Sequence, residues 1–435
     1  MEVIADDRPL TPCRSLIELI KNCFQINFIN VTGSGILFRL TTIISKSNYY
    51  DENNNPITQF IIKIVSLSEI QRFYDIIRSQ KTSTEKASSF LKEAQVQQSV
   101  WKKCILEGRP VFSPSVLNLS LFKFGQADSF LKLLKSKTEQ DNIILMNFIF
   151  ITSSSRRDIG VILMPEIENA VNLLDVLFEN KRTAYINTIV NILELYFFHG
   201  IIHLDLHGGN ILVQQDNSSR SKLIDFGEIM KINQNSRAKK SKKEVLTVDS
   251  DEDEDVIKFT EQREEDLANF ARIGMAAPDP IKIEFVEKIC RSMSEYDAEH
   301  AGTELNAEGQ LKFYKMKWIE TIYHDEALKH TVFLNAFNEL KRIEATKMPQ
   351  ALPPNTFNLD NGDPISYYCD EDIVICQPIT PTTVIDDTSE SKSICNIMGG
   401  IRSKKRIKLS KKKIRHILKS KKPKRKQRFS VKKRR

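Results

Sequence analysis

The sequence predicts an α+β fold with two lobes, a small β-rich N-terminal lobe and a larger, mainly helical C-terminal lobe. Runs of strand length that are rich in Ile, Phe, Val and Thr dominate the chain before residue 66, which is typical of β-structure. Apolar residues at helical spacing dominate after residue 170. The chain has 435 residues, of which 41% are hydrophobic, so it is long enough for a two-lobed domain with extensions.

The N-terminal lobe is expected to contain a sheet and one long helix. Its predicted elements are strands over residues 24–31, 36–45, 59–65 and 158–166 and a helix over 88–104. Within the helix, Phe90, Leu91 and Ala94 fall near one face. The apolar run 143–152 has the length of a strand and is expected in the core.

The C-terminal lobe is expected to be helical around two short strands. Its predicted elements are helices over 171–178, 184–199 and 264–275, further helix intermittently to about 348, and strands over 211–213 and 222–224. Between them, residues 231–243 are basic and residues 249–255 are acidic. Blocks of like charge without apolar periodicity are normally disordered, so we expect a flexible insertion at about 231–258.

Composition sets the ends of the chain apart from this domain. The predicted parts are an N-terminal extension (1–24), the two-lobed domain (25–348, with lobes of about 25–164 and 165–348), a linker (349–400) and a polybasic tail (401–435). The tail holds 20 of the 64 Lys and Arg residues and no acid, which leaves residues 1–400 with a net charge of −12. Its like charges predict disorder. They favour contact with nucleic acid phosphates, an acidic partner or an anionic membrane, and a solvated extension is the alternative.

Cysteine usage and the apolar runs bear on the compartment. Seven Cys lie scattered without a CxxC pair, which is typical of reduced thiols rather than of a disulfide frame or a zinc site. The N-terminus is polar and acidic, unlike a secretory signal. The chain contains no run of about 18 apolar residues, so no membrane span is predicted. We therefore expect an intracellular protein, in the cytoplasm or the nucleus.

Two motifs in the C-terminal lobe carry the strongest chemical signal. They are His203-Leu-Asp-Leu-His-Gly-Gly-Asn210 and, after a predicted strand, Asp225-Phe-Gly227. An Asp followed five residues later by Asn offers a base and a metal ligand from one loop, and an Asp at the end of the next strand offers a second ligand. Phosphoryl transfer needs such groups, because Mg²⁺ prefers hard oxygen ligands.

The joint pattern HxDxxxxN…DFG resembles the catalytic and metal-binding loops of the protein kinase superfamily. The resemblance implies an enzyme that uses ATP and Mg²⁺, with Asp205 as catalytic base and with Asn210 and Asp225 as Mg²⁺ ligands. It also implies a structural role for His203 and a tight turn at Gly227. Two alternatives remain open. One is a polar turn whose Asp and Asn cap backbone groups, and the other is a transition-metal site of His203, Asp205 and His207.

A kinase-like site also needs a strand Lys at the nucleotide phosphates and a helical Glu that orients it. Lys63, in the apolar run FIIKIV, resembles this Lys. A charge in an apolar strand is costly unless it is paired, although an edge Lys that faces solvent is the alternative. Glu93 has the best helical context for the Glu, and Glu85 and Glu69 compete with it.

Three weaker resemblances complete the predicted site. Gly33-Ser34-Gly35 resembles the start of a glycine-rich phosphate loop, although a hairpin turn would use the same residues. Met164-Pro165-Glu166-Ile167 resembles the hinge between lobes, where backbone groups would bind adenine. Asp266 resembles the Asp of a large-lobe helix that braces the catalytic loop, and a surface acid is the alternative.

The sequence departs from Ser/Thr protein kinases at two points. His207 occupies the position where those kinases usually carry a Lys, and no Ala-Pro-Glu motif follows. The loop is in this respect similar to those of aminoglycoside and lipopolysaccharide-core kinases, and kinases of large DNA viruses depart in the same ways. We expect a Ser/Thr protein kinase, because the charged insertion and the basic tail suit a protein substrate and other macromolecular partners. A small-molecule kinase and a nucleotide-binding pseudokinase scaffold are the alternatives.

Overall fold

The structure is a computed structural model. It describes residues 12–31, 35–42, 49–67, 73–74, 81–82, 87–138, 143–154, 157–215, 220–232, 251–300, 314–353 and 356–357. All of them belong to the first of the two units into which the chain divides, Met1–Ile385, and the second unit is Asp386–Arg435. The predicted tail, most of the predicted linker, and the residues Gly33 and Ser34 lie outside the described residues, so the predictions made for them stay predictions.

The N-terminal part is built on a five-stranded antiparallel sheet with the order β1-β2-β3-β7-β6. Its strands are β1 (Gln25–Val31), β2 (Gly35–Thr41), β3 (Gln59–Ser66), β6 (Asn118–Phe122) and β7 (Ile159–Pro165). Two short strands, β4 (Phe73–Tyr74) and β5 (Lys81–Thr82), pair with each other. Lys63 lies in the central strand, opposite Leu37 of β2 and Ile162 of β7.

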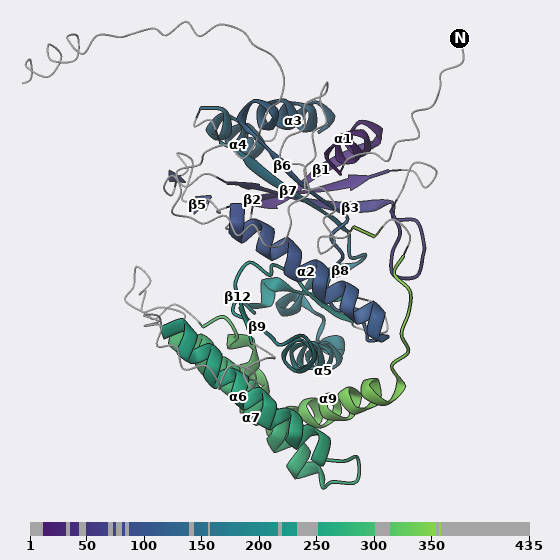
Figure 1. The fold of residues 1–435 in the computed structure, drawn as a ribbon, viewed down its shortest axis with the longest axis vertical. Coiled ribbons are helices and arrows are strands. Elements are labelled where there is room, and N and C mark those ends of the chain that lie inside the picture. The colour runs from purple at the N-terminus through teal and green to yellow at the C-terminus, as the bar shows by residue number, and fades with distance from the viewer. Residues whose placement is uncertain are drawn as a thin grey trace, which may run out of the picture. The chain divides into compact units, whose positions relative to one another are not determined.

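Helices cover both faces of this sheet, as Figure 1 shows. On one face lie α1 (Pro12–Asn22), α3 (Phe124–Lys137) and α4 (Ile143–Ser154), and on the other lies the long α2 (Ala87–Glu107). Leu16, Phe130 and Leu145 share a core with the first face, and Phe90 and Ala94 pack against the second. The long predicted helix of this lobe is thus α2.

Two predictions for this part were wrong. The apolar run at 143–152 is helical, because a short apolar run has no period that separates a strand from a helix. Its Leu145 and Phe148 are buried one turn apart. The predicted extension 1–24 contains α1, whose Leu16 and Ile20 are fully buried in the sheet core. The compact domain therefore begins before residue 25.

The C-terminal part is mainly helical around a large core that includes Phe197, Phe226 and Phe337. Its helices are α5 (Phe178–Glu194), α6 (Asp251–Arg272), α7 (Asp279–His300), α8 (Glu320–His324) and α9 (Glu326–Thr346), with a π-helix, η3 (Leu195–His199), and 3-10 turns η2 (Leu173–Asp175), η4 (Gly208–Asn210) and η6 (Lys317–Ile319). None of the helices in the described residues is both long and apolar enough to cross a membrane.

Short strands carry the predicted motifs. They are β8 (Ala170–Asn172), β9 (Ile201–His203), β10 (Ile211–Gln214), β11 (Ser221–Leu223) and β12 (Ile229–Lys231). They form the antiparallel sheets β11-β10-β8 and β12-β9. The helix predicted over 171–178 is replaced by β8, η2 and the first residue of α5.

Two further boundaries differ from prediction. Residues 251–258, expected in a flexible insertion, form the start of α6, and Phe259 of the same helix is buried in the core. The rest of the predicted insertion, 233–250, lies outside the described residues. The chain also remains packed beyond residue 348, since the Gln350 N–H donates to Ile105 O and Gln98 Nε2 donates to Phe357 O.

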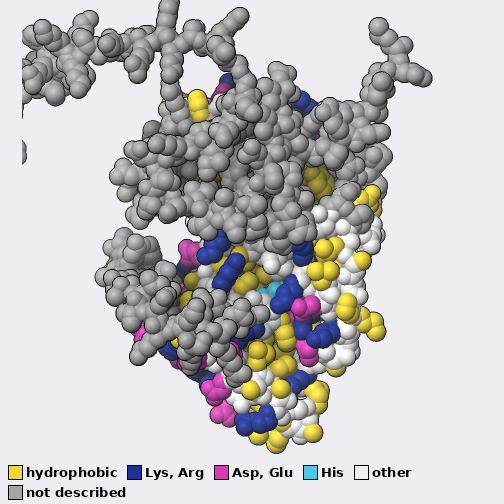
Figure 2. All heavy atoms as spheres, in the orientation of Figure 1, with side chains coloured by type: hydrophobic (Ala, Val, Ile, Leu, Met, Phe, Trp, Pro, Cys, Tyr) yellow, Lys and Arg dark blue, Asp and Glu magenta, His cyan; other side chains and the backbone are white. Residues whose placement is uncertain are grey.

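The face drawn in Figure 2 shows hydrophobic side chains among charged side chains of both signs over the described part. The net charge of +8 is therefore not displayed as a uniform basic field on this face.

Candidate active site

Lys63, Glu93 and Asp225 form one buried ion-pair cluster, which we call the Lys63 cluster. Lys63 Nζ is 2.7 Å from Glu93 Oε1 and 2.9 Å from Asp225 Oδ1. Strand β3 supplies the Lys, α2 supplies the Glu, and the turn after β11 supplies the Asp. Lys63 is only 5% exposed, so it does not face solvent from an edge strand, and its charge is balanced by these partners.

The Lys63 cluster holds one cation and two carboxylates. Burial opposes the charge on Lys63, but Glu93 and Asp225 outweigh it and raise the pKa of the ammonium. Burial also raises the pKa of Glu93, whereas the attraction of Lys63 outweighs burial at Asp225 and lowers the pKa of that carboxyl. Glu93 Oε2 is buried and has no hydrogen-bond partner among the described residues. The excess of carboxylate over cation suits the binding of a metal ion.

His203 joins the two motif loops. Its Nδ1 accepts a hydrogen bond from the Asp205 N–H at 3.2 Å, and its Nε2 is 3.1 Å from Ile224 O. With Nδ1 accepting, Nε2 carries the proton and donates it, so the ring is neutral. Burial lowers the pKa of His203 in keeping with this. Both ring nitrogens are engaged, which rules out the alternative in which His203 is a transition-metal ligand.

Asn210 is bound tightly to Asp205. Its Nδ2 donates to Asp205 O at 2.9 Å and to Asp205 Oδ2 at 3.1 Å. Because the amide nitrogen already donates to Asp205, the amide oxygen is the side-chain atom of Asn210 that can accept a hydrogen bond or bind a cation. The backbone of Asn210 also accepts a hydrogen bond from the Ile224 N–H at 3.0 Å, which ties the loop to the residue before Asp225.

Asp225 has a backbone conformation that few residues with a side chain adopt. Its φ is 61°, in the left-handed region, which Asp tolerates better than most residues. Phe226 is fully buried with its ring 5.2 Å from that of His203. Strained backbone of this kind is concentrated at functional sites, and here it turns the Asp225 carboxylate toward Lys63.

The structure changes the interpretation of Asp266. The buried Asp266, on α6, accepts a hydrogen bond from the Tyr196 hydroxyl at 3.1 Å. Asp266 is therefore not a surface acid, and the partner of its carboxylate lies in the π-helix η3 that precedes β9. Arg263, also on α6, donates to Tyr196 O at 2.9 Å and to Phe197 O. Tyr196 and Phe197 lie at the end of η3, and the last carbonyls of a helix have no partner within the helix. By donating to these carbonyls, α6 stabilises the segment that leads into the loop.

The remaining predicted residues lie in the N-terminal sheet or directly after it. Gly35 begins β2, at the end of that strand far from the hinge-like segment. In the hinge-like segment, Met164 Sδ accepts from Gln97 Nε2 at 3.1 Å. The Glu166 carboxylate pairs with Arg39, with Nε–Oε1 at 2.7 Å. The Glu166 N–H donates to Gln59 O at 3.0 Å, so this backbone donor is engaged within the protein and is not available to adenine.

Sequence reasoning missed two residues that touch the catalytic loop. Trp318 Nε1 donates to Leu206 O at 2.8 Å, and Lys315 Nζ lies 3.5 Å from Asp205 Oδ1. Both lie more than a hundred positions after the loop, in a segment without a motif. Pairing of this kind has no local signal in a single sequence. His207 is half-exposed, with Nε2 3.9 Å from Asp205 Oδ2.

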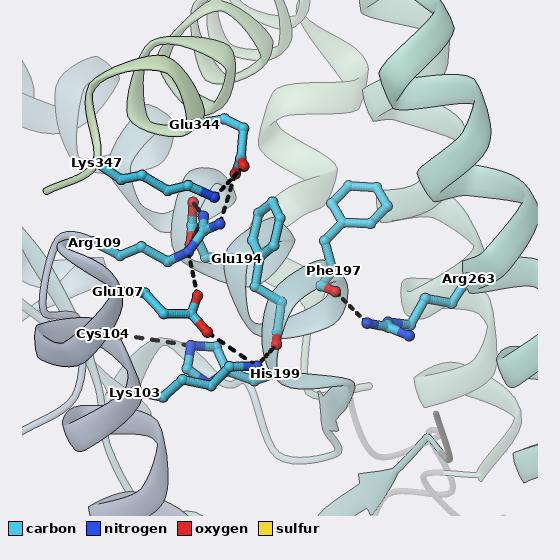
Figure 3. A network of polar contacts seen from close by, with 11 residues as sticks. Lys103, Cys104, Glu107, Arg109, Glu194, Phe197, His199, Arg263, Glu344 and Lys347 are labelled. Carbon is cyan, nitrogen blue, oxygen red and sulfur yellow. Dashed lines mark hydrogen bonds and ion pairs between the residues drawn. The ribbon is translucent and has the colours of Figure 1, made fainter. Parts of the chain in front are cut away.

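A second buried charged network lies where α2 ends (Figure 3). We call it the Arg109 network. Gly108, with φ of 67°, terminates the helix, and the Arg109 N–H donates back to Cys104 O at 2.8 Å. The Arg109 guanidinium contacts Glu107 at 2.9 Å, Glu194 at 3.1 Å and Glu344 at 2.6 Å. This network joins α2 to α5 and α9.

Comparison with protein families places a known domain type on the motif loops. Residues 170–258 match the ABC1 atypical kinase-like domain. This part of the chain is kinase-like. The matched segment contains Asp205, Asn210 and Asp225 but not Lys63 or Glu93, and it confirms the resemblance to the protein kinase superfamily predicted from the two motifs. No curated protein matches the chain.

Proposed function

We propose that this protein is an ATP-dependent phosphotransferase that moves the γ-phosphoryl group of Mg·ATP to a hydroxyl. The observation that carries the proposal is the Lys63 cluster, because it joins Lys63 and Glu93, from outside the matched segment, to Asp225 inside it. A small β-rich lobe and a larger helical lobe would then hold the nucleotide between them. Lys63 would contact the phosphates, as strand lysines of kinases do.

The residues at the site fit a Mg²⁺ ion. Asp225 and the amide oxygen of Asn210 are hard oxygen donors of the kind that Mg²⁺ prefers, and the Asp225 side chain is 33% exposed. The ion would hold the nucleotide phosphates and offset their charge. Glu93 would orient Lys63, because its Oε1 accepts a hydrogen bond from Lys63 Nζ at 2.7 Å.

Asp205 is proposed to act as the base. Its carboxylate would take the proton of the acceptor hydroxyl while the acceptor oxygen forms a bond to the γ-phosphorus. The bond from that phosphorus to the β–γ bridging oxygen breaks, and ADP leaves with the electron pair. Asn210 orients Asp205 by donating to Asp205 Oδ2 at 3.1 Å, and His203 holds the Asp205 backbone.

A protein Ser/Thr hydroxyl is the acceptor that we favour. Leu174, Leu177 and Phe178 are 60%, 54% and 94% exposed. Leu174 packs against Gly208 of the catalytic loop, where an added Cβ would meet Leu174 Cγ at 2.5 Å. Leu174 thus offers an exposed apolar side chain beside the catalytic loop, and such a surface suits a polypeptide better than a polar metabolite. The small-molecule alternative is favoured by His207 and by the match to an atypical kinase-like domain.

Transfer from labelled ATP tests the proposal. Purified protein is assayed for autophosphorylation and for transfer to casein, histone and a metabolite pool. The variants are Asp205→Asn and, as a matched control, Glu284→Gln, an exposed acid on α7. We expect transfer to protein, lost in Asp205→Asn with nucleotide binding retained, and normal in the control. Transfer only to metabolites would replace the protein acceptor, and unchanged turnover in Asp205→Asn would refute the base assignment. Nucleotide binding without any transfer would favour the pseudokinase.

A further inference from the structure

Lys315 lies in the segment between α7 and η6, and its side chain reaches both motif loops. Its Nζ is 3.5 Å from Asp205 Oδ1, and it also pairs with Glu228, the residue after Gly227. The Lys315 side chain is 28% exposed, whereas that of Glu228 is 62% exposed. The more buried of the two carboxylates that Lys315 meets therefore belongs to the proposed base, whose side chain is 23% exposed.

The segment that carries Lys315 is anchored on its C-terminal side. The N–H of the buried Met316 donates to Asp297 Oδ2 at 2.9 Å. Trp318 donates to Leu206 O at 2.8 Å, and its ring stacks on Tyr185 with centroids 5.9 Å apart. These contacts hold residues 315–318, which we call the Lys315 strap, across the catalytic loop. A side chain on such a support loses little entropy when it acts.

The catalytic loop has a need that Lys315 can meet. Phosphoryl transfer places negative charge on the transferred group and its neighbours, and position 207, two residues after Asp205, carries His. Its Nδ1 accepts a hydrogen bond from the Gly209 N–H at 3.1 Å, and its Nε2 lies 3.9 Å from Asp205 Oδ2. A His at this position is not a permanent cation, as a Lys would be.

Lys315 is a permanent cation beside Asp205. Burial opposes its charge, but the hydrogen bond to Glu228 and the charges of Asp205, Glu228 and Asp297 outweigh burial and raise the pKa of the ammonium. The catalytic loop itself contains no Lys, and the three-dimensional fold brings one to Asp205 from a distant part of the chain.

We propose that Lys315 is a positioning residue that orients the Asp205 carboxylate and places beside the reacting groups the permanent positive charge that position 207 lacks. The inference rests on the proposed function. Lys315 keeps its protons throughout, and the acceptor proton passes to Asp205.

Steady-state kinetics on four full-length variants test this role. They are Lys315→Met, Lys315→Arg, Lys315→Met combined with His207→Lys, and the control Lys317→Met, which changes an exposed Lys of the strap. We expect Lys315→Met to lower kcat by about 100-fold, the size of effect seen when one preorganised charge-stabilising group is lost. The KM for ATP should change by less than about 3-fold, because the nucleotide is held elsewhere.

The remaining variants separate the role from a structural one. Lys315→Arg should keep most of the activity, and His207→Lys should restore kcat of the Met variant by at least about 10-fold, because it places an ammonium two residues after Asp205. A Lys315→Met protein with normal kcat, while Asp205→Asn is inactive, overturns the inference and leaves the proposed function intact. Loss of kcat with a lowered melting temperature and no recovery by His207→Lys also overturns it. A wild-type protein without transfer overturns both.

Discussion

Buried charged side chains lie at both ends of α2, and they are paired in different ways at the two ends. Near its start, Glu93 joins the Lys63 cluster, in which one cation meets two carboxylates and one carboxylate oxygen of Glu93 has no partner in the described chain. Just past its end, Arg109 joins a network in which its guanidinium contacts three carboxylates. Two more cations balance these carboxylates, because Lys347 pairs with Glu344 and Lys103 Nζ lies 3.8 Å from Glu107 Oε1.

The difference separates a site for chemistry from a structural joint. In the Arg109 network the cation is 2% exposed, its planar face lies 3.5 Å from the Phe198 ring centroid, and every group contributes to holding helices together. In the Lys63 cluster Asp225 remains one-third exposed and carries an unusual backbone angle. Buried charge by itself is thus no sign of function. A buried carboxylate oxygen with no partner among the described residues, next to an Asp with an unusual backbone angle, is the more telling feature.

The largest expected effect is on catalysis at the Lys63 cluster. Asp225→Asn should lower phosphoryl transfer by at least about 1,000-fold, because it removes a ligand charge worth several kcal/mol to a metal-assisted transition state. The free energy of unfolding should change by less than about 1 kcal/mol, since the Lys63–Glu93 pair persists. Labelled transfer and urea unfolding measure the two quantities. A variant that loses stability and activity in parallel would show that the Lys63 cluster also stabilises the packing of β3, α2 and the turn after β11.

The next effect is on stability at the other end of the helix. Arg109→Met should lower the free energy of unfolding by about 3 kcal/mol, because it leaves Glu194 buried without its cation. The rate of transfer by the protein that stays folded should remain within several-fold of normal. Thermal unfolding with kinetics below the transition separates these, and Lys347→Met is the control, since that partly exposed Lys contacts only the rim carboxylate Glu344. Equal losses in both variants would count against a special role for Arg109.

A smaller effect is expected in the pH dependence of stability. Burial raises the pKa of Glu194 to about 7 from an ordinary value of 4.5, against the attraction of Arg109. The folded state therefore binds the proton more tightly than the unfolded state, and stability falls as pH rises through the folded pKa. Glu194→Gln should remove a decline of about 2 kcal/mol between about pH 5 and pH 7. Urea unfolding of the wild type, Glu194→Gln and the control Glu284→Gln across that range measures this decline. If Glu194 ionised normally, Glu194→Gln would leave the pH dependence of the free energy of unfolding unchanged.

The smallest effect is expected at an exposed pair. Arg39 and Glu166 connect β2 to the hinge-like segment, but the Arg39 side chain is 46% exposed. Exposed ion pairs contribute less than about 1 kcal/mol, so Arg39→Ala should leave melting temperature and kcat close to normal. A large rise in the KM for ATP would instead place this pair in nucleotide binding.

The sequence predicted well where chemistry and local pattern coincide. The motifs around Asp205 and Asp225 predicted a kinase-like domain, and the match over residues 170–258 confirms it. The buried Lys in an apolar strand predicted an ion pair, because an unpaired charge would be too costly there. The pattern failed where an apolar run lacks a period, as at 143–152, and where a run of acids begins a helix, as at Asp251.

The sequence by itself determined the residue types of the site, their order along the chain and their local strand and loop contexts, because those depend on neighbours a few positions apart. Only the tertiary structure decided which partners meet. It selected Glu93 for Lys63, gave Tyr196 rather than the catalytic loop to Asp266, and brought Lys315 to Asp205 across 110 positions. Contacts at such separations are set by the packing of the core and have no signature in one sequence.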